Sequence, residues 1–405
     1  LQELNTKTLT FGGTHVDVHR ETSDGRAFDF AGELVDVQGE TNINLQGQAR
    51  FAGNGLDLRA DTLTRKGANF DAQGHVRAEL VTPGPLKDGV RMPGQRAMVN
   101  CDTFKVEGFR IENQKVVATL VLAEGNLSGS GSFQDTQIDF SASAMQVEGW
   151  GERNLLTVAG RSTFHVVDGG RDWTIQADLI KGHTLLDVSH LTAEGNLVVD
   201  ETSIDFHGTG ERLELNRAAS VEAILEGGVE LAEVRGLLPG TEGSFNGRVA
   251  RIVMAPDLLE MEQLSGVLRG FALPGSDRPA ADLELRAEHL LSVTETTPLG
   301  LRDVLQLDGR VFLSRLVESG PPEVFRADHV TFLRVRKLGE SASLAPALTN
   351  TSFIAHGEIS MRQGAKFVAF GEHLEVSAPS QRMRFAGTPA SIVYAGLTIN
   401  SVELV

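Results

Sequence analysis

Three histidines follow an acidic residue at the same place in a short recurring motif, as Glu288-His289, Asp328-His329 and Glu372-His373. Carboxylate and imidazole groups brought together in this way could bind a metal ion or respond to pH. If each motif marks a repeating unit of two strands, however, successive histidines lie about 10 Å apart, which is too far for one ion. We therefore expect these side chains to face solvent, and we predict no metal site.

Other residues that could bind a ligand or catalyse a reaction give weaker signals. His183, His190 and His207 share one stretch without the spacing of metal ligands, so we expect them at the surface. Residues 128–131 (SGSG) resemble part of a phosphate-binding loop but lack the Lys-Ser/Thr that follows in such loops, and we expect a turn there. Neither a nucleophile elbow nor an acid/base pair can be singled out. The sequence therefore predicts neither an enzyme nor a cofactor.

The charge balance bears on the class of partner. The chain has 405 residues, with 37 Lys and Arg against 54 Asp and Glu, and a formal net charge of -17 at pH 7. This charge repels the phosphate backbone of nucleic acids. We therefore expect no nucleic-acid partner.

Cysteine content and apolar runs limit the chain further. Cys101 is the only cysteine, so an intrachain disulfide and a cluster of thiolate ligands are excluded. The longest apolar stretches, such as 116–123, are far shorter than the roughly 20 residues of a membrane-spanning helix. Because the sequence starts at Leu1 within an expected strand and shows no leader, we expect a processed or trimmed piece, whose missing leader does not count against export.

The chain is repetitive. A small residue, usually an acidic residue, any residue and an apolar residue recur at intervals of 33 to 44 residues. The motif starts at Ala60, Cys101, Ala177, Gly210, Ala287, Ala327 and Gly371, with weaker copies at Ala144 and Ala250. Apolar residues inside each unit alternate with polar ones, which is typical of half-buried strands.

Dipeptides that contain glycine separate the expected strands. Gly227-Gly228, Asn54-Gly55, Asn246-Gly247 and Asp308-Gly309 tolerate positive φ, and we expect them to form turns between strands. Units with one apolar face are stable when they stack. The sequence thus predicts an elongated, repetitive, all-β antiparallel stack with no substantial helix. We expect residues 1–405 to form one continuous body, with soft subdivisions at 1–95, 96–240 and 241–405.

Two segments, 204–231 and 370–404, resemble the OstA-like, or LptA-like, periplasmic domain of lipopolysaccharide transport. In that family a small, an acidic and an apolar residue open a strand, and a glycine precedes the next strand. The motif at Gly210 with the later Gly227-Gly228, and the motif at Gly371 with the later Gly387, follow that order. Members that form the periplasmic bridge are single, shorter modules, so this chain would hold two or three modules in tandem.

The resemblance implies a V-shaped β-jellyroll, or β-taco, whose inner apolar groove holds acyl chains. Burying each methylene contributes about 0.8 kcal/mol, and sliding along a uniform groove exchanges like contacts. We expect a non-enzymatic bridge that binds and transfers lipopolysaccharide or another envelope lipid. Its expected place is the periplasm of a Gram-negative-type bacterium, with any membrane anchor in a segment outside this sequence. The alternative is a structural or adhesive β-solenoid with a closed core.

The expected groove and ends follow from the same pattern. The groove-facing candidates are Phe206, Leu213, Leu215, Val221, Leu225, Val229, Phe370, Leu374, Val376, Phe385 and Ile392. Residues 393–405 contain no proline-rich or charged block that would prevent strand addition. We therefore expect end-to-end strand pairing with a homologous β-jellyroll protein or with a second copy of this chain.

Overall fold

A computed structural model shows an all-β chain, and its described residues contain no helix. The structure describes residues 8–21, 27–39, 42–53, 55–82, 86–87, 90–91, 95–112, 115–133, 136–150, 154–168, 171–183, 190–202, 206–217, 221–235, 242–254, 257–271, 281–298, 300–315, 322–336, 351–364, 367–377 and 382–404. The chain divides into two compact units, Leu1–Leu197 and Val198–Val405. This boundary falls within β14 (His190–Glu201) and coincides with neither of the expected subdivisions.

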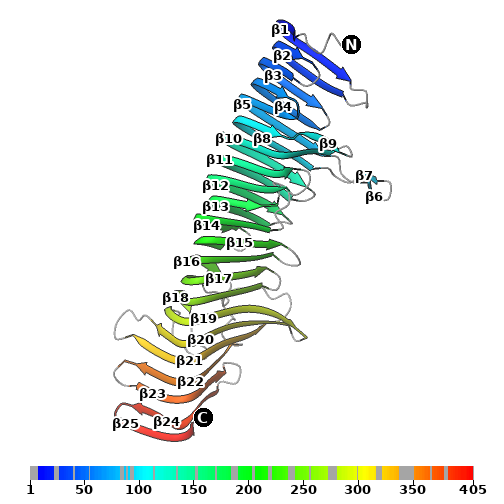
Figure 1. Ribbon diagram of the computed structural model, residues 1–405. Coiled ribbons are helices and arrows are strands. Elements are labelled where there is room, and N and C mark those ends of the chain that lie inside the picture. Colours follow the sequence, from blue (N-terminus) through cyan, green and yellow to red (C-terminus); the bar gives the residue numbers. More distant parts are fainter. Residues whose placement is uncertain are drawn as a thin grey trace. The chain divides into compact units, whose positions relative to one another are not determined.

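Unit 1 is a ladder of antiparallel strands stacked in chain order (Figure 1). Its strands before β14 are β1 (Thr8–Glu21), β2 (Ala27–Gln38), β3 (Asn42–Gly53), β4 (Leu56–Lys66), β5 (Asn69–Thr82), β6 (Leu86–Lys87), β7 (Val90–Arg91), β8 (Gln95–Glu107), β9 (Arg110–Glu112), β10 (Lys115–Phe133), β11 (Thr136–Trp150), β12 (Leu155–Asp168) and β13 (Arg171–Gly182). Each long strand pairs with the next, and β5 pairs directly with β8 because β6 and β7 form a separate small hairpin. The short β9 pairs with the start of β10.

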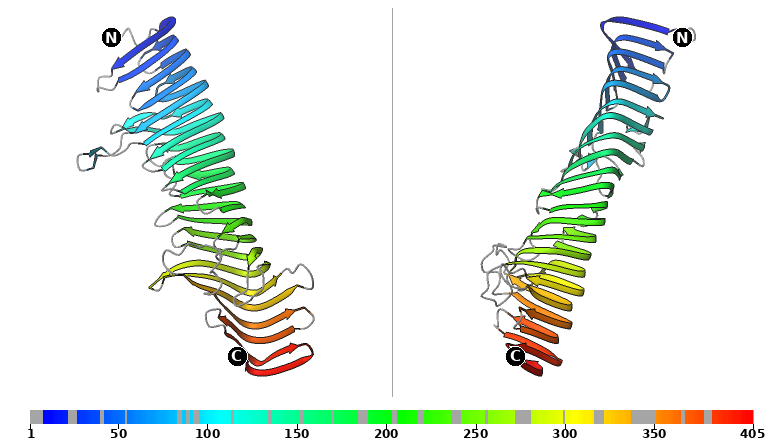
Figure 2. Two further views of the ribbon diagram at one scale, coloured as in Figure 1. Left: turned by 180° about the vertical axis from the view of Figure 1, so that it is seen from behind. Right: turned by 90° about the vertical axis from the view of Figure 1, so that its left-hand side faces the viewer.

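Unit 2 repeats the same arrangement. Its strands after β14 are β15 (Phe206–Arg217), β16 (Val221–Arg235), β17 (Glu242–Met254), β18 (Asp257–Phe271), β19 (Ala281–Thr297), β20 (Gly300–Arg315), β21 (Glu323–Arg336), β22 (Thr351–Gln363), β23 (Phe367–Ser377), β24 (Arg382–Tyr394) and β25 (Leu397–Leu404). Each pairs antiparallel with its neighbour in sequence, and the strands are visibly bent (Figure 2). The expected repetitive antiparallel β stack is therefore confirmed.

The recurring motif is a bulge in the middle of a strand. In β4, Leu56, Leu58 and Ala60 alternate on the buried face, but the next buried residue is Leu63. The two residues between Ala60 and Leu63 both face outward, and the register with β5 shifts at this point. The alternation of faces therefore slips by one residue at the motif, and a β-bulge of this kind bends the strand.

The following strand has a glycine with positive φ opposite the acidic residue of this bulge. Gly74 of β5 has φ of 75°, and a Cβ on it would lie 2.2 Å from Oδ2 of Asp61 in β4. The same relation joins Gly125 of β10 to Asp102 of β8. The acidic side chain of each motif therefore occupies the space that a glycine leaves on the next strand, and the repeat consists of an acid strand and a glycine strand.

The residue after the glycine holds the carboxylate. His75 Nδ1 lies 2.9 Å from Oδ2 of Asp61, and Asn126 Nδ2 donates to Oδ2 of Asp102 over 2.8 Å. His75 and Asn126 themselves have positive φ, near 45°, a conformation that Asn adopts more readily than most residues. These hydrogen bonds make the motif a structural corner.

Three of the four expected turns were wrong. Gly227-Gly228, Asn246-Gly247 and Asp308-Gly309 lie inside β16, β17 and β20. Gly55, by contrast, stands between β3 and β4 with φ of 86°. Gly227, Gly228 and Gly309 have positive φ inside these strands, as a glycine at a turn does, whereas Asn246 and Gly247 do not.

Two weak copies of the motif have shifted positions. The copy placed at Ala144 starts two residues earlier, since Ser143 stands where other units have the acid, and its Oγ donates to the Gly160 carbonyl over 3.3 Å. The copy placed at Ala250 starts at Gly247, with Arg248 at the acid position and ion-paired with Glu262 of β18. An ion pair therefore takes the place of the acid and glycine in this corner.

Cys101 provides a test of the corner's packing. It occupies the small position of its motif and is 4% exposed. Burial, followed by the charge of Asp102, raises the pKa of its thiol to about 12. Because the thiolate is the reactive form, we expect the folded protein to react with an aromatic disulfide reagent about 10³-fold more slowly than the denatured chain. Release of the coloured thiolate measures both rates, and similar rates would contradict a buried Cys101.

Candidate functional site

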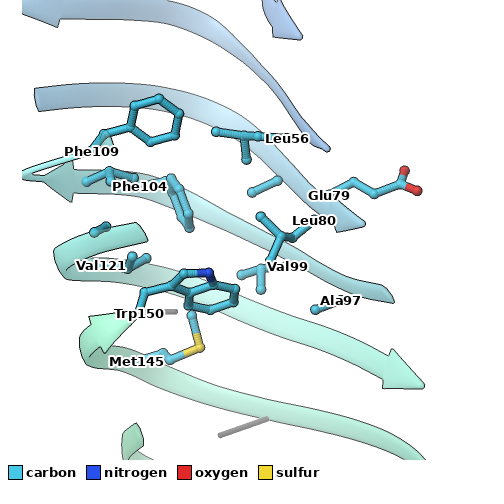
Figure 3. A pocket seen from close by; sticks show the side chains of 13 residues that line it. Leu56, Glu79, Leu80, Ala97, Val99, Phe104, Phe109, Val121, Met145 and Trp150 are labelled. Carbon is cyan, nitrogen blue, oxygen red and sulfur yellow. The ribbon is translucent and has the colours of Figure 1, made fainter. Parts of the chain in front are cut away.

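An apolar cavity lies in unit 1 between β4 and β11. Its volume is about 40 Å³. It is lined by Leu56, Ala78, Glu79, Leu80, Ala97, Val99, Phe104, Val106, Phe109, Ala118, Val121, Met145 and Trp150. Figure 3 shows the ring of Trp150 beside Met145 and the rings of Phe104 and Phe109 further along the same space. All but one of these side chains are apolar.

The lining residues reveal how the bent strands enclose this space. Val99 and Val106 belong to the two halves of β8, on either side of its motif at Cys101, and both line the cavity. A straight strand could not place both around one space, because seven residues of extended chain span about 23 Å. The strand halves of unit 1 therefore form two walls that face each other across the cavity and meet at the row of bulges.

One side of the cavity reaches solvent. Leu80 and Trp150 are half-buried, and the Glu79 carboxylate points away from the apolar side chains (Figure 3). Arg96 Nη2 lies 2.8 Å from Oε1 of Glu79, and Arg77 is 4.0 Å from its Oε2. The rim thus carries both charges, while the interior between the walls is lined by apolar side chains.

The groove candidates from the sequence lie in unit 2, and most are on the inner face. Phe206, Leu213, Leu215, Leu225, Val229, Leu374 and Phe385 are at most 5% exposed. Val376 and Ile392 are half-buried, and the side chain of Val221 lies outside the described residues. The structure places these residues together on one buried face, but the apolar cavity lies in unit 1, where the sequence pattern singled out no residue.

The expectation that Phe370 faces the groove was wrong. Its side chain is 52% exposed, whereas its neighbour Ala369 is 1% exposed. Strict alternation puts Phe370 and Leu374 on one face, but the motif that starts at Gly371 lies between them and shifts the phase. The bulge therefore turns Phe370 outward.

A second cluster runs along the outer side of the bulges in unit 2. Cross-strand pairing joins His289 of β19 to Asp308 of β20, then to His329 of β21, His356 of β22 and His373 of β23. We call these five residues the histidine row. The three motif histidines lie two strands apart, as expected, and the intervening glycine strands contribute Asp308 and His356, which the sequence motif does not mark.

The first half of the histidine row is held by carboxylates. His289 Nε2 lies 2.8 Å from Oε1 of Glu260 in β18, and its Nδ1 lies 3.8 Å from Asp308. His329 Nδ1 contacts the Asp308 carboxylate, and its Nε2 lies 2.8 Å from Thr331 Oγ1. Both ring nitrogens of His329 are therefore engaged.

These contacts shift the pKa of both carboxyl groups. The hydrogen bond from His289 is the largest influence that lowers the pKa of Glu260. Burial acts to raise the pKa of Asp308, but the hydrogen bond from His329 and the neighbouring charges outweigh it, so this pKa is also lowered. The two carboxylates thus stay ionised to lower pH than usual.

The second half of the histidine row contains only imidazoles. His356 Nδ1 and His373 Nδ1 are 3.0 Å apart, and their ring centroids are 4.6 Å apart. Burial, then repulsion from His373 and His329, lowers the pKa of His356. Its imidazole is therefore neutral near pH 7, the form with a free nitrogen lone pair.

The remaining sequence candidates show no shared site. His207 Nδ1 lies 2.5 Å from Asp200, and the rings of His183 and His190 are 6.4 Å apart. The expected turn at 128–131 was wrong, because these residues lie inside β10. A Cβ on Gly129 would lie 2.1 Å from the Phe140 ring, so this glycine serves close packing.

Comparisons complete the description. Within the part of the chain that the structure describes, no helix could span a membrane, and no three or more His, Cys, Asp or Glu side chains form a group that could hold a metal ion. The resemblance to the lipopolysaccharide-transport domain stays a prediction. Searches with the sequence and the structure found no matching family, no matching curated protein and no matching solved structure.

Proposed function

We propose that this chain is a non-enzymatic lipid-binding protein that holds acyl chains between the two apolar walls of its bent sheet. The cavity lined by Val99, Phe104 and Trp150 carries the proposal, because it is apolar throughout its interior and charged at its rim. The apolar interior and charged rim suit an acyl chain whose polar head stays in water. The cargo class we propose is lipopolysaccharide or another acylated lipid of the bacterial envelope, and the compartment is the periplasm.

The size of the cavity defines what lipid binding requires. A volume of about 40 Å³ holds only about three water-sized groups, so longer chains enter only as the walls part or side chains rearrange. Met145 is suited to such rearrangement, because its unbranched thioether adapts to changing neighbours. Lipid binding is thus expected to increase the separation of the walls around β8.

The small volume of the cavity also favours one alternative function. Leu213, Leu225 and Val229 are 0% exposed, which is typical of a core filled by its own side chains. A structural or adhesive β-solenoid with a closed core would have this property. The two functions differ in one measurable respect, since only the first takes up an apolar guest.

A crosslinking experiment distinguishes them. A photoreactive phenylalanine derivative at Leu80, on the rim, is expected to crosslink to acyl chains when the purified chain is mixed with lipopolysaccharide or diacyl phospholipid. The same group at Gln73, an exposed residue of the same strand that does not line the cavity, is the control and is expected to give about tenfold less product. Native mass spectrometry should show about one lipid per chain. Equal crosslinking at both positions, or no bound lipid, supports the closed core.

The proposed partner follows from the strand edges. β25 pairs with β24 only, among the described residues, and Leu397 and Val402 on it are 71% and 70% exposed. Exposed apolar side chains on a strand favour the addition of another strand. A homologous β-jellyroll protein or a second copy of this chain is therefore the proposed neighbour at this edge.

A further inference from the structure

The pair formed by His356 and His373 differs from most histidine contacts of the chain. Other imidazoles, such as those of His75, His207 and His289, contact a carboxylate. His356 and His373 contact each other, and the described residues place no carboxylate in contact with either ring. Two adjacent imidazoles without an acid offer two nitrogen ligands at one point.

The backbone fixes this pair. His356 and His373 lie directly opposite each other on the antiparallel strands β22 and β23. His356 precedes Gly357, whose φ is 89°, and Asp328 fills the space beside that glycine. The Glu358 amide donates to Oδ2 of Asp328 over 3.1 Å, which ties the corner together. Both imidazoles are therefore presented outward from a rigid bulge.

The distance between the two nitrogens suits a metal ion. Imidazole nitrogens lie about 2.0–2.1 Å from Zn²⁺ or similar ions. Two such ligands are then about 2.9 Å apart at a bond angle of 90° and about 3.3 Å apart at the tetrahedral angle. The separation of 3.0 Å between His356 Nδ1 and His373 Nδ1 falls inside this range, near its square-planar end.

We propose that His356 and His373 form a two-histidine binding site for a divalent transition metal, with Cu²⁺ bound most tightly. Water completes the coordination, because no third His, Cys, Asp or Glu of the described residues is grouped with the pair. Cu²⁺ is favoured over Zn²⁺ by its general affinity for nitrogen ligands and by its preference for angles near 90°. This site lies on the outer face of unit 2 and does not depend on the proposed lipid cavity.

His329 is a neighbour of this site but not a ligand. Its ring lies 6.0 Å from the ring of His356, and Asp308 and Thr331 occupy its two nitrogens. The variant His329→Gln should therefore change the metal affinity by less than about threefold. Substitution of a direct ligand, by contrast, should weaken metal binding at least about tenfold.

Copper titration of the whole chain, without an affinity tag that binds metals, tests the proposal. Calorimetry should reveal one Cu²⁺ per chain, and His356→Gln and His373→Gln should each weaken it at least about tenfold. Electron paramagnetic resonance should show hyperfine coupling to two nitrogens, reduced to one in either variant. His75→Gln is the matched control, because it removes an exposed histidine at a bulge of unit 1 that contacts Asp61.

Two further measurements test whether the variants stay folded and whether Cu²⁺ stabilises the protein through this pair. Circular dichroism should show that each variant keeps its strands, and Cu²⁺ should raise the melting temperature of the wild type but not of His356→Gln/His373→Gln. Undiminished binding in the double variant would overturn the proposal. An equal loss of binding in His75→Gln, or a spectrum without coupled nitrogens, would do so as well.

Discussion

Phe51→Ala is expected to lower the free energy of unfolding of unit 1 by about 3–5 kcal/mol. The ring is fully buried, and its centroid lies 5.6 Å from that of Phe28 and 4.8 Å from that of Phe70. Phe109 approaches it edge-on at 6.4 Å. Phe51 thus joins the two walls of the bent sheet, and its removal leaves a space that neither wall can close.

The matched control is another phenylalanine of unit 1. Phe11 in β1 is 44% exposed, so Phe11→Ala should change the free energy of unfolding by less than about 1 kcal/mol. Chemical denaturation followed by circular dichroism compares the two variants, and hydrogen exchange of β2 to β5 locates the loss. If Phe51→Ala costs no more than Phe11→Ala, the walls do not pack against each other as described.

Gly125→Ala is expected to destabilise unit 1 by about 2–4 kcal/mol. Gly125 has φ of 76°, and its new Cβ would lie 2.4 Å from Oδ2 and 2.9 Å from Cβ of Asp102. Contact with the Asp102 Cβ cannot be relieved by rotating the carboxylate. The variant therefore combines backbone strain with displacement of the acid from the corner.

Two further variants separate these contributions. Gly67 has φ of 61° with nothing within 4 Å of an added Cβ, so Gly67→Ala should cost about 1–2 kcal/mol from strain alone. Asp102→Ala removes the contact with the carboxylate, though not the contact with Cβ, and it removes the hydrogen bond from Asn126. The double variant Asp102→Ala/Gly125→Ala should then be less destabilised than the sum of the single ones, by about 1–2 kcal/mol. Strict additivity in denaturation midpoints would refute the pairing of acid and glycine.

Sequence reasoning identified the repeat but not its geometry. Alternating residues such as Leu213 and Leu215 predict strands correctly, because strand periodicity is local. Gly227-Gly228 looked like a turn, since a glycine with positive φ has the same local signature at a turn and at a bulge. The shift in alternation that exposes Phe370 could not be predicted without knowing whether the glycine marks a turn or a bulge.

The candidate sites were harder to predict for a related reason. His356 joins His373 only through the register of β22 with β23, and no pattern around His356 marks it as the partner. Val99 and Val106 line one cavity only because β8 bends between them. A useful signal was present nevertheless: β20 and β22 each carry a glycine opposite the acid of the preceding strand, and the residue just before that glycine joins the row.

The ladder also determines how such a chain can change in length. Each long strand pairs with the neighbouring long strands in chain order, and acid strands alternate with glycine strands, as β2 to β5 illustrate. Loss or duplication of a single strand would bring two acid strands, or two glycine strands, into contact. Duplication or deletion of a coding segment for one whole pair keeps every remaining junction complementary. The protein is thus built to lengthen or shorten in steps of two strands.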